Sequence, residues 1–149
     1  MSHDRDREAR NIDLAVRYHQ AVSGGASAEE ITRFLAPGMI HEELPNLLFP
    51  EGAVRDLDAM REAAERGREA MAEQRFEVRN AVAAGDQVAL EVEWWGRLAV
   101  PYGPYPAGHV LRARIAAFLR VEHGRIVAQR NYDCYETTAP DSAAPDPTH

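Results

Sequence analysis

The chain has 149 residues, the length of a single domain. Hydrophobic residues make up 45% of it, enough to bury a core, and no apolar run approaches the roughly 20 residues of a membrane-spanning helix. Its 17 basic and 24 acidic residues give a net charge of −7, with no basic cluster on any segment. Nucleic acids and membranes are therefore not expected as partners.

The basic residues are all arginines, because the sequence contains no lysine. Schiff-base chemistry and the phosphate-binding lysine of P-loop proteins are thereby excluded. A single cysteine, Cys134, permits no internal disulfide, and the first residues lack the apolar stretch of a signal peptide. The sequence therefore predicts a cytoplasmic protein.

Hydrophobic periodicity predicts three helices in the first half of the chain. The first covers about residues 8–23 and follows a charged segment, residues 1–9, that we expect to be flexible. The second is short and begins with Ser27 and Glu30 in the spacing of a capping box. The third starts after Asp56 and has one charged face and one apolar face.

The second half of the chain alternates apolar with polar residues, which is typical of strands. We expect a hairpin that turns at Gly85-Asp86, followed by strands at Val110–Val121 and Arg125–Tyr135. A shorter strand, Met39–Leu44, precedes the third helix, and three prolines make residues 101–106 a loop. Helices followed by a strand meander indicate an α+β fold with the helices on one sheet face.

This order of elements resembles the nuclear transport factor 2-like superfamily, above all its SnoaL-like proteins and ketosteroid isomerases. The resemblance extends from about Asp13 to Glu136. Its most specific stretches are residues 34–43 (FLAPGMIHEE) and residues 121–127 (VEHGRIV).

The resemblance implies an α+β fold in which a cone-shaped, curved antiparallel sheet is wrapped by three N-terminal helices. It implies a single SnoaL-like domain over residues 10–137, followed by a tail, residues 138–149, that we expect to be disordered. The sheet and helices would enclose one deep apolar pocket, with a small apolar molecule as the expected ligand.

Ketosteroid isomerases use a carboxylate base beside a tyrosine and a protonated acid that hold an enolate oxygen. By resemblance the tyrosine is Tyr18 and the base is Glu43, whereas Ala116 occupies the position of the acid. Loss of one such donor costs on the order of 2.7–4 kcal/mol of transition-state stabilisation, so a steroid isomerase is not expected. SnoaL-like cyclases instead carry an acid on the final strand, which corresponds to Asp133.

The lining of the pocket follows from alternation along the strands, with Asp133 taken as pointing inward. On the last strand, this places Val127, Gln129 and Asn131 inward as well. The family register adds residues from the two preceding strands, namely Leu90, Val92, Trp94, Arg112, Arg114, Ala116 and Phe118. The expected substrate-binding residues are Trp94, Arg112, Arg114, Phe118 and Asn131.

The same register leaves an apolar stripe on the other face of the strand that starts at Val110. Its members are Leu111, Ala113, Ile115, Ala117 and Leu119, and no helix remains in the sequence to cover them. We therefore expect a homodimer through that sheet face.

Structural interpretations of the candidate residues stay open. Glu43 could be a solvated loop carboxylate, Tyr18 a core aromatic, and Asp133 the partner of Arg114 in a buried ion pair. His41 lies two residues before Glu43 and would face the same way, where it could transfer protons or orient Glu43. A third ligand at a recognisable spacing is missing, so neither a metal nor another cofactor is expected.

Two functions remain. The first is a general acid/base enzyme acting on an apolar carbonyl or epoxide substrate by isomerisation, cyclisation or epoxide opening, with Tyr18, His41, Glu43 and Asp133 as catalytic residues. The second is a non-catalytic ligand-binding or dimeric scaffold protein of the same fold.

Overall fold

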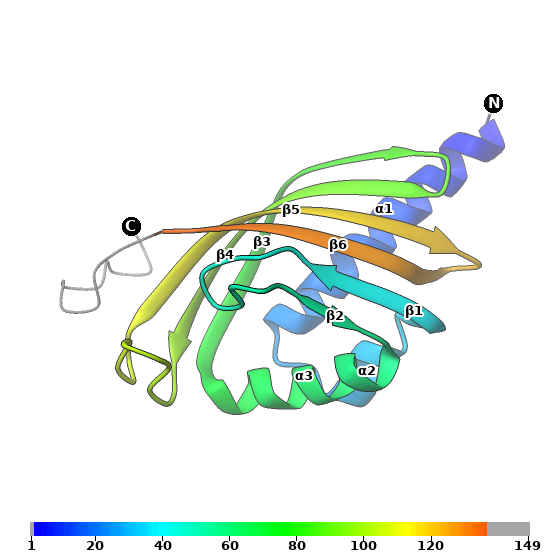
Figure 1. The fold of residues 1–149 in the computed structure, drawn as a ribbon. Coiled ribbons are helices and arrows are strands. Elements are labelled where there is room, and N and C mark those ends of the chain that lie inside the picture. Colours follow the sequence, from blue (N-terminus) through cyan, green and yellow to red (C-terminus); the bar gives the residue numbers. More distant parts are fainter. Residues whose placement is uncertain (1, 137–149) are drawn as a thin grey trace.

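A computed structural model of the chain describes residues 2–136 (Figure 1). The helices are α1 (Ser2–Ser23), α2 (Ala28–Thr32) and α3 (Leu57–Ala70). The strands are β1 (Leu35–Glu43), β2 (Ala53–Arg55), β3 (Met71–Ala84), β4 (Gln87–Leu98), β5 (Val110–Glu122) and β6 (Arg125–Tyr135). Within the described range, no helix has the length and apolar character needed to span a membrane.

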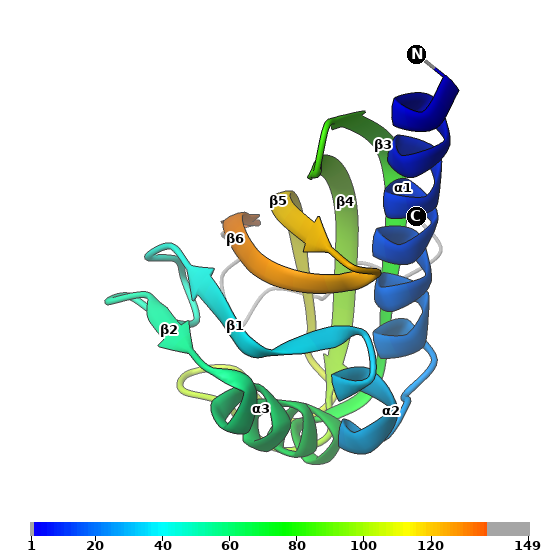
Figure 2. The ribbon, with the colours of Figure 1, turned by 90° about the vertical axis from the view of Figure 1, so that its right-hand side faces the viewer.

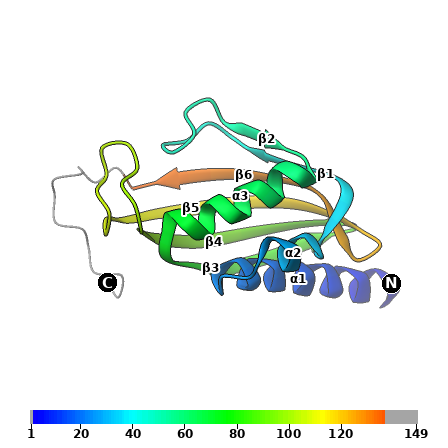
Figure 3. The ribbon, with the colours of Figure 1, turned by 90° about the horizontal axis from the view of Figure 1, so that it is seen from below.

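The strands form one six-stranded sheet in the order β2-β1-β6-β5-β4-β3. Strands β3 to β6 are the antiparallel meander that the sequence predicts, whereas β1 joins the free edge of β6 in parallel. Figure 2 shows that the sheet is strongly curved. In Figure 3, α3 lies across the concave face and α1 runs beside β3, so the helices cover the concave side only. The predicted α+β fold is confirmed.

The predicted helix starts are confirmed by their caps. The Ser27 hydroxyl accepts a hydrogen bond from the Glu30 amide at 3.2 Å, and the Glu30 carboxylate accepts one from the Ser27 amide at 3.4 Å. The Asp56 carboxylate accepts from the Ala59 amide at 2.9 Å, at the start of α3. Each cap satisfies backbone donors that have no partner within the helix.

Several boundaries differ from the prediction. α1 begins at Ser2, so residues 2–9 belong to the first helix, and the Glu8 carboxylate accepts a hydrogen bond from the Gly85 amide at 2.8 Å. β1 begins at Leu35, before the Pro-Gly pair, and its register against β6 shifts after that residue. The connection between β1 and α3, for which no strand was predicted, contains β2 (Ala53–Arg55). The predicted tail, residues 138–149, lies outside the described residues.

The apolar stripe on β5 is buried in the core, contrary to the prediction. Its members are Leu111, Ala113, Ile115, Ala117 and Leu119, all at most 8% exposed. Residues directly opposite in an antiparallel pair point to the same face, and Ile115 is paired with Asp133. An inward Asp133 therefore requires an inward Ile115, so the register taken from the family was one residue off. Because the stripe is buried within the chain, it does not support the predicted homodimer.

A bulge breaks the alternation at the start of β6. The register shifts between Arg120 and Val121, whose partner is Ile126. As a result Ile126 is fully buried, whereas Val127, which was predicted to line the pocket, is half-buried and does not line it. An extra residue in one strand reverses the face of every side chain before it.

Candidate active site

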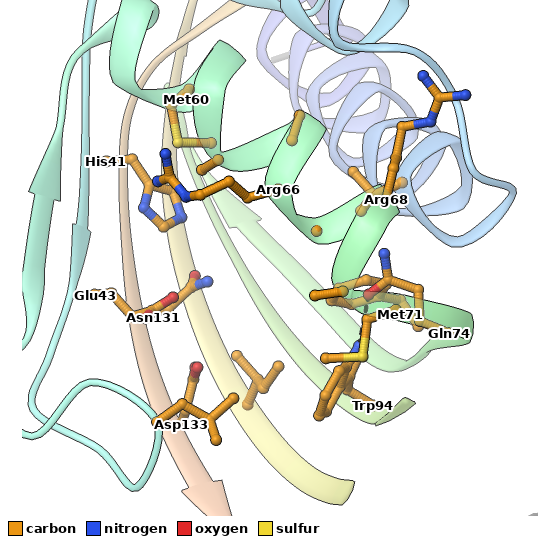
Figure 4. Close-up of a pocket in the computed structure, with 18 of the residues that line it drawn as sticks. His41, Glu43, Met60, Arg66, Arg68, Met71, Gln74, Trp94, Asn131 and Asp133 are labelled. Carbon is orange, nitrogen blue, oxygen red and sulfur yellow. Dashed lines mark hydrogen bonds between the residues drawn. The ribbon is translucent and has the colours of Figure 1, made fainter. Parts of the chain in front are cut away.

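The concave face of the sheet and the helices enclose a cavity of about 470 Å³. Its wall is mostly apolar, with Met60 from α3, Met71 and Phe76 from β3, and Trp94 and Leu98 from β4. Figure 4 shows Trp94 and Met71 across the cavity from β6. Small-molecule sites range over roughly 300–1,000 Å³, so this cavity can hold a ligand the size of a ring system.

The polar side chains of the cavity gather on β1 and β6. They are His41 and Glu43 from β1 and Gln129, Asn131 and Asp133 from β6. In the parallel pairing of these strands, His41 is opposite Gln129 and Glu43 is opposite Asn131. Because alternate residues share a face, the pairing builds one polar wall (Figure 4). The three β6 side chains point inward as the sequence predicted.

Asp133 is the most strongly perturbed acid on this wall. Burial and the nearby charge of Glu43 raise the pKa of Asp133 from 3.8 to about 7, against a smaller opposing effect of a hydrogen bond with Tyr135. Its Oδ1 atom is buried without a hydrogen-bond partner in the described part of the chain. Arg114 is opposite Cys134 on the outer face, so the alternative of an Asp133–Arg114 ion pair is wrong. Near pH 7, Asp133 is therefore present in both its acid and its ionised form.

Burial raises the pKa of Glu43 as well, but polar neighbours oppose this effect. Its side chain is 13% exposed, which excludes a solvated loop residue, and its Oε1 atom lies 3.8 Å from Nη1 of Arg55. Asn46 Nδ2 donates to Oε2 at 3.5 Å. Burial raises the pKa of Glu43, while Arg55 and Asn46 act in the opposite direction. The two carboxyl groups thus share one cavity but have different environments.

His41 is 5% exposed. Burial is the main cause that lowers the pKa of His41 from 6.5 to about 4, and the charges of Arg55 and His19 add to this shift. The imidazole is therefore neutral at physiological pH and can accept a hydrogen bond there but does not act as a cationic acid.

The family model of the SnoaL-like domain matches residues 15–129, most of the chain. The chain belongs to the SnoaL-like family. No curated protein matches it.

Solved structures share the fold of this SnoaL-like chain at low sequence identity. AclR of Streptomyces galilaeus, a candidate hydroxylase, has a TM-score of 0.71 and 19% identity, over 85% of this chain and 76% of that one. IdmH of Streptomyces antibioticus, a candidate polyketide cyclase, has a TM-score of 0.69 and 20% identity, over 83% and 91%. An LEH-like epoxide hydrolase of M. tuberculosis has a TM-score of 0.61 and 16% identity, over 85% and 84%. At these identities the likeness concerns the fold alone.

Two further predicted residues of the SnoaL-like site lie in the cavity wall. Trp94 donates from Nε1 to Gln74 Oε1 at 3.1 Å, and its ring packs edge-on against Tyr135. Tyr18 is 5% exposed, its ring contacts His19 and Phe34 edge-on, and burial raises the pKa of Tyr18 to about 12. It is both a core aromatic and a wall residue, so its hydroxyl is neutral and can only serve as a hydrogen-bonding group.

Three predicted substrate-binding residues are outside the cavity. Arg112, Arg114 and Phe118 do not line it, because they alternate with the buried stripe of β5 and so face the convex side. Phe118 is 41% exposed, and its ring packs against Tyr132. The prediction that they line the pocket is wrong, because the register assumed for β5 was one residue off.

Other residues of the cavity wall were not predicted from the sequence. Tyr135 continues the alternation of Asp133, so a signal for it was present, whereas Arg55 and Leu48 lie in or beside a segment with no periodicity. Tyr102, from the proline-rich loop, donates from its hydroxyl to the Leu48 carbonyl at 2.8 Å. This bond joins the two loops that border the cavity, β1–β2 and β4–β5.

Proposed function

We propose that this SnoaL-like protein is an enzyme that catalyses proton transfer on an apolar carbonyl compound without a cofactor. The observation that carries the proposal is the pair Glu43 and Asp133, two carboxyl groups of different environment in one apolar cavity. The names of similar structures, a candidate polyketide cyclase and an LEH-like epoxide hydrolase, are compatible with it.

The chemistry follows from the protonation states. Glu43, ionised beside Arg55, takes a proton from the carbon next to the carbonyl group. Asp133, in its acid form, gives its proton to the carbonyl oxygen, so the product is an enol. In an isomerisation, the enol oxygen of a conjugated enol gives its proton back to Asp133 while Glu43 delivers the carbon proton to a different carbon. In a cyclisation, the enol carbon attacks a second carbonyl group, the enol oxygen gives its proton back to Asp133, and Glu43 protonates the new alkoxide oxygen.

Asn131 is paired with Glu43, lies two residues before Asp133 on β6, and supplies a further donor. Its Oδ1 atom accepts a hydrogen bond from Gln129 Nε2 at 2.9 Å, which leaves the Asn131 NH₂ group to donate to a developing oxyanion. The apolar wall around Trp94 excludes water, which strengthens these electrostatic interactions.

The same pair is suited to opening an epoxide. Asp133 would protonate the leaving oxygen, and Glu43 would deprotonate the attacking water. Hydrolysis of styrene oxide tests this variant of the proposal.

Hydrogen–deuterium exchange tests the main proposal without knowledge of the substrate. The probe is 2-tetralone, an apolar ketone with acidic protons, followed by NMR in D₂O. We expect the protein to accelerate exchange, and Glu43→Gln and Asp133→Asn each to lower the accelerated rate by about 100-fold or more. Glu42→Gln is the matched control, because Glu42 alternates with the cavity residues of β1.

Full exchange and epoxide-opening rates in both variants would contradict the proposal. They would favour the second function, a protein that binds a small ligand without transforming it.

A further inference from the structure

A second histidine, His19 of α1, lines the cavity but has no part in the proposed proton transfer. It is 5% exposed, and its Nδ1 atom lies 2.8 Å from the carbonyl oxygen of Ala15, four residues earlier on the helix. A carbonyl oxygen can only accept a hydrogen bond, so Nδ1 carries the proton of the neutral ring. The other ring nitrogen, Nε2, is then a hydrogen-bond acceptor.

Nε2 of His19 opens onto the cavity. Three buried side-chain atoms lack a hydrogen-bond partner within residues 2–136, namely His41 Nδ1, Gln129 Oε1 and Asp133 Oδ1. Nε2 of His19 is not one of them, although it forms no hydrogen bond in that part of the chain, so protein atoms do not enclose it. The ring lies edge-on to Tyr18 and Phe76, which both line the cavity, so the cavity is the open space that Nε2 meets.

His19 lies at the His41 end of the polar wall. Burial is the main cause of the lowered pKa of His41, followed by the charges of Arg55 and His19, and the last effect requires the two histidines to lie near each other. His41 is two residues before Glu43 on β1, which is roughly 7 Å along a strand. A group bound at His19 is therefore separated from Glu43 by about the span of a two-ring compound.

Packing alone does not require a histidine at this position. A phenylalanine ring would make the same edge-on contacts with Tyr18 and Phe76. What the imidazole adds is the fixed lone pair on Nε2, which the bond to Ala15 directs away from the helix backbone.

We propose that His19 binds a hydroxyl group of the substrate through Nε2, apart from the two acids. This assignment rests on the proposed function and narrows its substrate class to hydroxyl-bearing carbonyl compounds. Burial lowers the pKa of His19, against the smaller opposing effect of the Ala15 bond, so the ring is neutral at pH 7. A neutral acceptor favours an uncharged donor, because burial of a charged group without an opposite charge is costly. The neighbouring aromatic rings suit a hydroxyl group carried on a ring.

Calorimetric titration with two matched probes tests the ligand class. The probes are 6-hydroxy-2-tetralone and 6-methoxy-2-tetralone, apolar ketones that differ by one methyl group, which removes the hydrogen-bond donor. We expect the hydroxyl probe to bind about tenfold more tightly, as one net hydrogen bond predicts. Equal affinity, tighter binding of the methoxy probe, or no binding of either would overturn the proposal.

His19→Phe tests whether the preference comes from His19. The variant keeps an aromatic ring and removes the acceptor, so the affinity for the hydroxyl probe should fall to that for the methoxy probe. His3→Phe is the matched control, since it makes the same substitution at an exposed position of α1 and should keep the tenfold preference. A preference that survives His19→Phe would contradict the assignment.

The wild-type protein provides a second test that does not depend on the folding of a variant. Long-range ¹H–¹⁵N spectra at pH 7, assigned through the backbone, report the protonation of each ring nitrogen. We expect His19 to carry its proton on Nδ1, and its Nε2 signal to move upfield further with the hydroxyl probe than with the methoxy probe. A proton on Nε2, or equal movement with both probes, would overturn the proposal.

Neither measurement depends on turnover, so a failure of the proposed enzymatic function can be told apart. The expected preference without accelerated deuterium exchange would support the hydroxyl site and contradict the proton transfer. Accelerated exchange without the preference would overturn the hydroxyl site alone.

Discussion

At the scale of single residues, the site depends on the different environments of two acids, Glu43 and Asp133. Glu43 is neutralised in part by Arg55, whereas Asp133 has a neighbouring negative charge and a buried oxygen that finds no hydrogen-bond partner among residues 2–136. A raised pKa in the folded state means that the fold favours the protonated acid. The site therefore carries a cost in stability that grows as the pH rises, which is common where function requires a perturbed group.

This cost predicts the effect of Asp133→Asn on stability. Well below pH 3.8 the acid is protonated in both the folded and the unfolded state, and no penalty exists. Between pH 4 and pH 7 the unfolded chain ionises first, so the wild-type protein loses up to about 4 kcal/mol, the equivalent of a shift from 3.8 to about 7. Asp133→Asn should lose less stability than the wild-type protein over this pH range. Urea unfolding of both proteins at pH 4 and pH 8 measures the difference in the free energy of unfolding.

Asp6→Asn, which removes an exposed acid on α1, serves as the control and should leave the pH dependence of the wild type unchanged. If the stability of Asp133→Asn depended on pH as that of the wild-type protein does, the fold would not raise the pKa of the Asp133 carboxyl group.

At the scale of elements, the sequence predicts helices and strands well where a local signal exists. The caps of Ser27 and Asp56 and the turn at Gly85 depend on neighbouring residues only, and the structure has all three. The early start of β1 could not be foreseen, because a Pro-Gly pair usually ends regular structure. β1 continues across Pro37 and Gly38 because Leu35 before them and Ile40 after them both pair with β6.

The faces of the strands were harder to predict than their positions. The inward face of β6 was predicted from Asp133, which does point inward, so Asn131 was placed correctly. The inward face of β5 was predicted by analogy with the family, and the structure has the opposite face inward. The pairing of Ile115 with Asp133 is a non-local fact that neither strand encodes alone. Consequently the sequence identified both acids of the site but placed Arg114 and Phe118 on the wrong face.

At the scale of the whole molecule, the convex face of the sheet has no helix over it among residues 2–136 (Figure 2). Exposed apolar side chains are spread across it, from Ile40, Val54, Val82, Phe118 and Tyr132. Charged residues of both signs lie between them, with arginines on β5 and β6 and glutamates on β4. A two-fold axis that placed β5 and β6 of one copy over β4 of the other would bring arginines over glutamates.

We propose that two copies of this chain associate through the convex face. Sedimentation velocity should show a dimer, and Phe118→Asp should weaken it by about 30-fold or more, as expected for a buried aromatic contact. Leu47→Asp is the control, because Leu47 is 40% exposed but lies in the β1–β2 loop. A wild-type monomer, or a dimer that tolerates Phe118→Asp, would contradict this arrangement.

The proposed chemistry requires a carboxyl group in the cavity that can give and take a proton near neutral pH. Its most direct test is the titration of the Asp133 carboxyl carbon by ¹³C NMR, with the Asp133→Asn spectrum to assign the signal. We predict a midpoint of about 7 that falls when Glu43→Gln removes the neighbouring negative charge. A midpoint at the ordinary value of 3.8 would show that Asp133 is fully ionised at pH 7, and the proposed acid/base chemistry would then be wrong.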